Sequence, residues 1–327
     1  MTPKLDLERS YGLIKKGACA LETSRDAVVV RGPDARGWLQ GQVSQDLGPL
    51  ALGDSAETLV LSPQGKVDSY CRVTILADDV VLLDTETGYG EALSERLRRF
   101  RLRVKAELES RTVRCLEVRG PASAALAGSG LGLGMIVGGR GPDPGEGAPD
   151  LGEDWSVAVP VSWTGYSGFD VLAPVGVPKR PHLDVPFGDP AAFEAARIEA
   201  GVPALGRELT EKTIPQEAGS LVEHTVSFTK GCYTGQELVA RLDVRGGNVA
   251  WRLRGVVLDP AAESPAGARL FAGEREVGRL TSVAWSPGFT APVALAYVRR
   301  DVVPPFVATA APHGAIAKIW ELPLQIG

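Results

Sequence analysis

The chain has 327 residues, 44% of them hydrophobic, which is long enough for two or three domains with their own cores. No run approaches the roughly 20 apolar residues that span a bilayer, and the first residues lack the apolar stretch of a signal peptide. We therefore expect a cytoplasmic protein with no membrane partner. The net charge is −5 and the pI about 5.4. This balance disfavours a basic surface for phosphate backbones, so no direct nucleic-acid partner is expected.

The cysteine pattern argues against a metal site. The four cysteines lie far apart in the chain, and none forms a Cys-x-x-Cys pair of the zinc or redox kind. They are Cys19, Cys71, Cys115 and Cys232. A self-contained zinc or iron-sulfur site is therefore not expected, and the prediction for bound metal is none.

The first part of the chain predicts an antiparallel sheet with helices. Short apolar runs are separated by Gly and Pro turns, and two segments show the apolar spacing of helices. The predicted helices cover Ala35–Val43 and Tyr89–Phe100. The predicted strands cover Val28–Arg31, Leu59–Leu61, Cys71–Leu76, Val80–Asp84, Val104–Leu108 and Thr112–Val118.

The middle of the chain contains a segment of unusual composition. Residues 127–153 are mostly Gly, Pro and acidic residues, which bury too little apolar surface to order well. We interpret it as a flexible loop that ligand binding does not need. Its glycines lack the Gly-x-Gly-x-x-Gly spacing and following helix of a dinucleotide site.

The second half predicts two more strands, a well-marked helix and a small β module. Strands are expected at Val157–Val161 and Phe169–Leu172, and Asp189-Pro190 should begin a helix that Gly201 ends. After residue 247 the pattern changes to short β runs with turn signals. We therefore expect an α+β fold with antiparallel sheets, divided into a region of two intertwined subdomains at 1–247 and a β-barrel domain at 248–327.

Residues 230–237 read Lys-Gly-Cys-Tyr-Thr-Gly-Gln-Glu and carry the most specific signal in the chain. Thr234 and Glu237 have capping-box spacing, which predicts a helix start there. Cys232 would then lie at a positive helix end beside Lys230, an environment that favours the reactive thiolate. The alternative is that Cys232 is a small buried hydrophobic residue, as most free cysteines are.

This octapeptide resembles the signature of the YgfZ family, the folate-binding relatives of the glycine-cleavage T-protein. Arg197-Ile-Glu-Ala-Gly-Val-Pro203, Leu39-Gln-Gly-Gln-Val-Ser-Gln-Asp46 and Trp163-Thr-Gly-Tyr-Ser-Gly-Phe-Asp170 also match the family. The resemblance spans most of residues 10–260. It implies three domains arranged in a ring around a folate channel, with the barrel at the C-terminal end.

The resemblance also implies a cofactor, partners and site residues. The cofactor is tetrahydrofolate or a derivative, and the partners are iron-sulfur client enzymes such as a tRNA methylthiotransferase. Glu199 occupies the position that contacts the pterin ring in T-proteins, and a carboxylate can accept two pterin hydrogen bonds. The matched aromatic residues Trp163, Tyr166 and Tyr233 could stack on the folate, although core packing accounts for each of them equally well.

The resemblance leaves three functions open. In the first, the protein is a folate-binding accessory factor for iron-sulfur cluster assembly or repair, indirectly supporting tRNA modification, with Cys232 and Lys230 as acting residues. In the second, it is a tetrahydrofolate-dependent aminomethyltransferase or related one-carbon transferase, with Asp68 as the catalytic acid. Ser69 replaces the second acid of that T-protein motif, so classical aminomethyl transfer is doubtful. The third is a demethylating folate enzyme acting on a small amine.

Overall fold

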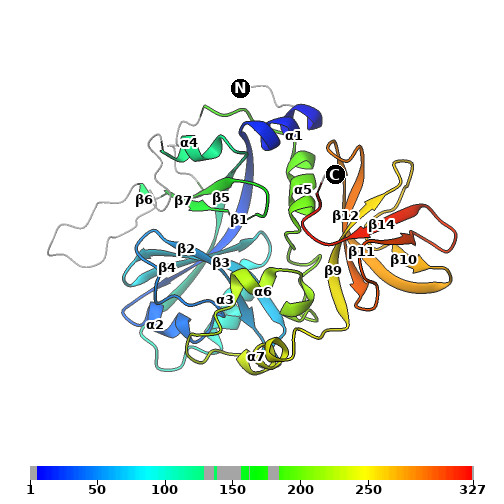
Figure 1. The fold of residues 1–327 in the computed structure, drawn as a ribbon. Coiled ribbons are helices and arrows are strands. Elements are labelled where there is room, and N and C mark those ends of the chain that lie inside the picture. The colour runs from blue at the N-terminus through cyan, green and yellow to red at the C-terminus, as the bar shows by residue number, and fades with distance from the viewer. Residues whose placement is uncertain (1–5, 129–135, 138–155, 162, 176–183, 326–327) are drawn as a thin grey trace.

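The computed structural model describes residues 6–128, 136–137, 156–161, 163–175 and 184–325. Figure 1 shows a large sheet with helices on one side of the view and a β-barrel on the other, and α5 stands between them. Most of the 127–153 segment lies outside the described residues. The α+β fold class with a C-terminal barrel is confirmed.

Within the described residues, the large sheet has eight antiparallel strands in the order β2-β3-β4-β1-β5-β8-β7-β6. The long central strand β1 pairs with β4 on one side and with β5 on the other. The strands are β1 (Cys19–Arg31), β2 (Ser55–Leu61), β3 (Val67–Ala77), β4 (Val80–Glu86), β5 (Glu107–Arg119), β6 (Ile136–Val137), β7 (Ser156–Pro160) and β8 (Gly168–Pro174).

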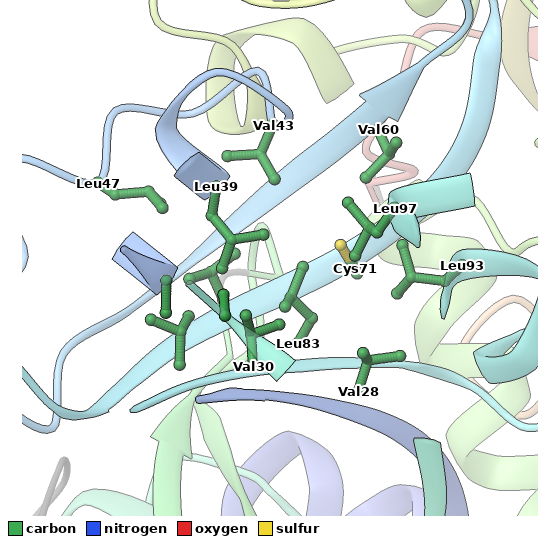
Figure 2. Close-up of a cluster of buried hydrophobic side chains, with 14 of the residues drawn as sticks. Val28, Val30, Leu39, Val43, Leu47, Val60, Cys71, Leu83, Leu93 and Leu97 are labelled. Carbon is green, nitrogen blue, oxygen red and sulfur yellow. The ribbon is translucent and has the colours of Figure 1, made fainter. Parts of the chain in front are cut away.

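Alternation along β1 divides its side chains between two cores. Val28 and Val30 belong to a cluster that α2 (Ala35–Gln40) and α3 (Gly90–Arg98) cover, and Val29 belongs to a cluster on the opposite face. Figure 2 shows the first cluster, with Leu39 from α2 and Leu93 from α3 on the same side of the sheet. Successive strand residues point to opposite faces, so one apolar strand supplies both cores.

The helix α5 (Pro190–Ala200) joins the sheet region to the barrel. Its boundaries agree with the sequence prediction, because Asp189 caps the first turn through Ala191 N–H and Gly201 ends the helix with φ 78°. Ile198 packs against residues of the barrel such as Leu253. The other helices are α1 (Leu7–Lys16), α4 (Ser123–Gly128), α6 (Leu221–Thr225), α7 (Gln236–Val244) and the 3₁₀ turn η1 (Pro215–Glu217).

The C-terminal strands close into a barrel in the order β10-β11-β12-β9-β14-β13. Its first strand begins at Trp251, just beyond the predicted boundary at 247. An apolar core that includes Val256, Leu280 and Ile319 fills its interior. The strands are β9 (Trp251–Leu258), β10 (Arg269–Ala272), β11 (Arg275–Ser286), β12 (Ala291–Arg299), β13 (Phe306–Thr309) and β14 (Ile316–Trp320).

Three local predictions differ from the structure. The two strands expected at 104–108 and 112–118 are one strand, β5, because its whole length pairs with β1. The helix expected at 35–43 ends at Gln40, where Gly41 begins a tight turn. Phe100 lies beyond the end of α3 and is 39% exposed, so it is not part of the buried stripe.

Candidate functional site

A cavity of about 250 Å³ lies between one face of the large sheet and α5. Its volume is slightly below the range of about 300–1,000 Å³ that is usual for ligand pockets. Its lining includes both acidic and basic side chains and a few aromatic residues. The lining consists of Leu21, Arg25, Glu57, Tyr70, Cys71, Arg72, Glu86, Glu117, Arg119, Val161, Trp163, Asp170, Pro190, Phe193, Glu194, Arg197, Val202, Pro203, Ala204 and Arg207.

The pleat of β3 brings charged side chains to this cavity. Val73 and Ile75 point into the apolar core beneath α2 and α3, whereas Tyr70 and Arg72 reach the cavity on the opposite face. Arg72 lies directly across from Asp84 of β4 in the antiparallel pair. Opposite charges therefore meet at a cross-strand pair.

Two buried aspartates join three arginines beneath the cavity. Asp84 accepts two bonds of 3.0 Å from Arg72 and one of 2.6 Å from Arg25 Nε. Asp170 accepts bonds of 3.0 Å from Arg72 and 2.7 Å from Arg119. Burial opposes ionisation of Asp170, but the charges of Arg119 and Arg72 prevail and lower its pKa to about 2. Asp170 is therefore ionised, and the network crosses five strands.

Arg119 and Trp163 form the part of the cavity best suited to a ligand. The guanidinium of Arg119 lies 4.5 Å from the ring centroid of Trp163, and Arg119 is only 2% exposed. Its Nε atom is a buried donor without an acceptor among the described residues. Nearby, Glu57 and Glu86 face the same cavity, and burial raises the pKa of both carboxyl groups. The cavity thus offers a flat aromatic wall, a free donor and carboxylate acceptors.

Glu199 does not line this cavity but lies in a separate buried cluster. Its carboxylate accepts hydrogen bonds from the Tyr11 hydroxyl at 3.0 and 2.9 Å, from Tyr166 at 2.5 Å and from Ser286 at 2.5 Å. Lys15 Nζ adds a contact of 3.4 Å. We call these five residues the Glu199 cluster.

The Glu199 cluster ties together α1, α5, the turn before β8 and strand β11 of the barrel. Burial, together with the Glu199 charge, raises the pKa of both tyrosines, so their hydroxyl groups stay protonated donors. Glu199 is 1% exposed, so its carboxylate is not available to solvent. Its role as a pterin acceptor stays a prediction, and in this structure protein donors already occupy its oxygens.

Lys230 anchors the octapeptide to the loop after α2. Its ammonium donates to the carbonyl oxygens of Gln40, Val43 and Gln45 at 2.6, 2.9 and 2.7 Å. Burial lowers the pKa of Lys230 to about 8, against the opposing effect of the Asp46 carboxylate. The ammonium has three donors and meets three acceptors here. Two motifs that lie far apart in the sequence are therefore joined by one side chain.

The capping box predicted at Thr234 is wrong. The residue before α7 is Gly235, which has φ 82° and makes no side-chain cap bond. A Cβ at this position would lie 2.5 Å from Ser62 O, so the close approach to the Ser62 turn requires glycine. Thr234 instead donates its backbone N–H to Gly41 O, and the Glu237 side chain is 91% exposed. Tertiary packing of the loop has replaced the local cap.

Cys232 is exposed, whereas the other three cysteines are buried. The alternative of a buried hydrophobic cysteine is therefore excluded. Burial raises the pKa of Cys19 to about 11 and also raises those of Cys71 and Cys115, so these thiols are poor nucleophiles. The ammonium of Lys230 makes its hydrogen bonds to the 40–45 loop. Cys232 therefore lies on a loop that Lys230 holds against residues 40–45.

The remaining predicted residues lie in different places. Asp68 pairs with Arg96 of α3 at 2.7 Å and does not line the cavity. It occupies a register shift where β3 pairs with β2, and such a bulge re-aims a side chain. Tyr233 is 7% exposed in an apolar core with Leu59 and Leu61. Of the four predicted folate contacts, only Trp163 lines the cavity.

Sequence reasoning missed the charged residues beneath the cavity. Arg72 lies in a mostly apolar part of β3, Asp84 follows four apolar residues of β4, and Asp170 follows a buried phenylalanine. A charge in the middle of a buried strand signals a partner, because an unpaired buried charge is too costly. That signal identifies the residues but not which of them meet.

Comparisons with known proteins agree with this architecture. A family model described as the glycine cleavage T-protein C-terminal barrel domain matches residues 252–316. The tRNA-modifying protein YgfZ of Edwardsiella ictaluri is 29% identical over 229 residues, which cover 67% of this chain and 65% of that protein. The resemblance to the YgfZ family is confirmed. A putative chloroplastic transferase of Arabidopsis thaliana is 28% identical over 282 residues, which cover 83% of this chain and 63% of that protein.

A solved structure shows the same fold. The glycine cleavage system aminomethyltransferase T from Bartonella henselae superposes with a TM-score of 0.79 at 22% identity, covering 99% of this chain and 90% of that one. The chain spans about two thirds of the length of the two named sequence relatives. In the part of the chain that the structure describes, no helix is long and apolar enough to cross a membrane.

Proposed function

We propose that the protein is a folate-binding accessory factor that supports iron-sulfur enzymes of tRNA modification through Cys232. The observation that carries this proposal is the exposure of this one thiol on a loop that Lys230 fixes to the sheet region. Support also comes from the T-protein fold and from similarity to proteins named as tRNA-modifying.

The cavity residues fit a tetrahydrofolate-like ligand. Trp163 offers a flat surface for a pterin or aminobenzoyl ring, and the unpaired Arg119 Nε can donate to a ring acceptor. Glu57 and Glu86 can accept from ring N–H and amino groups. Arg207 lines the cavity with a side chain that is 43% exposed, and it could turn from its ion pair with Glu194 to the carboxylates of a glutamate tail. When bound, the folate would supply one-carbon chemistry at its ring nitrogens.

The one-carbon transferase alternative is less well supported. It assigns the catalytic acid to Asp68, but Asp68 faces α3, is bonded to Arg96 and does not line the cavity. Reaching the cavity would require breaking this pair and crossing the sheet. Neither the transferase nor the demethylating enzyme has a specific observation in its favour.

Replacing Trp163 by alanine should weaken tetrahydrofolate binding roughly fivefold to tenfold, the amount expected for one lost aromatic contact. Isothermal titration calorimetry measures this affinity directly. Trp285→Ala is the matched control, because Trp285 is 42% exposed on the barrel. Equal affinities for the wild type and Trp163→Ala would remove the cavity from the proposal, provided that thermal melts show both proteins folded.

Cys232→Ser should keep the fold and the folate affinity but fail to restore activity in cells that lack the endogenous relative. The exposed side chain contributes little packing, whereas the serine hydroxyl cannot replace sulfur as a soft ligand or nucleophile. The readout is the methylthio modification of tRNA, measured by mass spectrometry. Thr234→Ala in the same loop is the control and should complement. Full complementation by Cys232→Ser would show that the thiol is dispensable and overturn the proposal.

A further inference from the structure

The net charge of −5 conceals a local strip of positive charge at the C-terminal end of α3. Residues 98–105 read Arg-Arg-Phe-Arg-Leu-Arg-Val-Lys, with five cations and no acid. We call residues 98–105 the basic strip. All five cationic residues are exposed. The expectation of no nucleic-acid partner rested on the net charge of the whole chain, and a net charge does not reveal a local cluster of cations.

Three cations of the basic strip are free to bind an external anion. Among the described residues, the side chains of Arg99, Arg103 and Lys105 make no hydrogen bond or ion pair, whereas Arg98 pairs with Glu91 at 3.0 Å and Arg101 donates to Ala106 O. The neighbouring acids are Glu91 and Glu95 on α3, Glu107 and Glu109 on β5, and Asp34, which accepts from the Lys105 backbone N–H. The segment from 91 to 111 still carries an excess of cations.

Exposed apolar side chains are interleaved with these cations. Phe100 is 39% exposed, and the Arg96 guanidinium lies 4.0 Å from its ring centroid. Its backbone carbonyl accepts from the Trp38 indole, which fixes the segment against α2. Leu102 is 81% exposed, and Arg103 has a left-handed φ of 58°. The strip thus offers an aromatic face beside several guanidinium groups on a held loop.

We propose that the basic strip binds the phosphate backbone of an unpaired polynucleotide strand. Guanidinium groups match phosphate oxygens in fork geometry, and four of the five cations are arginines. Cations combined with an exposed aromatic ring are the pattern of single-strand binding. A lipid surface fits less well, because interfacial anchors combine a basic face with a broad apolar face and only two large apolar side chains are exposed here. The proposal is independent of folate and of the Cys232 thiol.

The test is fluorescence anisotropy with a labelled 12-nucleotide uridine RNA, followed from 50 to 200 mM salt. Three phosphate contacts predict a log-log salt slope of about −2 and a roughly 20-fold loss of affinity over this range. The triple variant Arg99→Gln, Arg103→Gln, Lys105→Gln should lose that slope and at least about tenfold in affinity at 50 mM salt. The matched control is Arg269→Gln, Arg275→Gln, Lys318→Gln on the barrel, which removes the same charge and should bind as the wild type.

Binding measurements with other ligands identify the class of molecule that the basic strip binds. A thymidine DNA of the same length distinguishes RNA from DNA, and binding of either strand supports the proposal. Absence of binding at 50 mM salt, or equal weakening by the two triple variants, would overturn it. Binding to phosphatidylserine vesicles without binding to RNA or DNA would overturn it in favour of a lipid surface, and binding only to polyglutamate in favour of an acidic protein. Cys232→Ser should bind RNA normally, so failure here is distinguishable from failure of the proposed function.

Discussion

Glu199→Ala should lower the free energy of unfolding by about 3–5 kcal/mol, the cost of removing one partner from a buried charged cluster. The substitution leaves the hydroxyl groups of Tyr11, Tyr166 and Ser286 without their acceptor in a buried site. It also loosens the attachment of the barrel to α5, because Ser286 belongs to β11. Chemical denaturation followed by circular dichroism measures the loss.

Two further variants separate stability from ligand binding. Glu237→Ala is the control for stability, because this side chain is 91% exposed and the variant should unfold as the wild type. Glu199→Gln keeps the shape and one acceptor oxygen, so we expect it to be destabilised less than the alanine variant. The tetrahydrofolate affinity of folded Glu199→Gln then tests the pterin prediction. Unchanged affinity would place Glu199 in a structural cluster alone.

Asp170→Asn should destabilise the sheet region by about 3–5 kcal/mol at neutral pH, because Arg72 and Arg119 would lose the charge that compensates them.

The same carboxylate predicts a pH dependence of stability. Its pKa is about 2 in the folded protein and 3.8 ordinarily, so the folded state favours the ionised form. Its stabilisation is therefore present above about pH 4 and is lost as the pH falls from 4 to 2, by roughly 2 kcal/mol.

Urea denaturation at a series of pH values measures this effect. In Asp170→Asn, the free energy of unfolding should change less between pH 4 and 2 than it does in the wild type. Glu91→Gln is the control, since the Arg98–Glu91 pair is exposed and solvent screens it. If the free energy of unfolding of Asp170→Asn fell between pH 4 and 2 as much as that of the wild type, the Asp170 carboxylate would not govern acid unfolding.

Local signals predicted elements well where sequence and packing agree. The α5 helix was placed correctly because Asp189-Pro190 and Gly201 fix its ends whatever lies around it. The capping box at Thr234 failed for the opposite reason. Gly235 meets the turn at Ser62, and a distant contact of this kind leaves no trace in a local pattern.

The candidate site divides in the same way. The resemblance found Trp163 and the exposed Cys232, which are features of contiguous motifs. It placed Glu199 by motif position, but the side of α5 that faces the cavity depends on how the helix packs on the barrel. Asp68 points to α3 because of a strand bulge, and bulges have no reliable sequence mark here.

The three bonds of Lys230 have a consequence for how the protein matures. They join positions separated by 185 to 190 residues, so a ribosome must make more than two thirds of the chain before they can form. Until Lys230 has been made, the carbonyl oxygens of residues 40, 43 and 45 lack the ammonium group that donates hydrogen bonds to them. The Cys232 loop acquires its fixed shape only on a sheet region that has already folded. Unfinished chains that end before Lys230 therefore cannot hold this loop in the position seen in the folded protein.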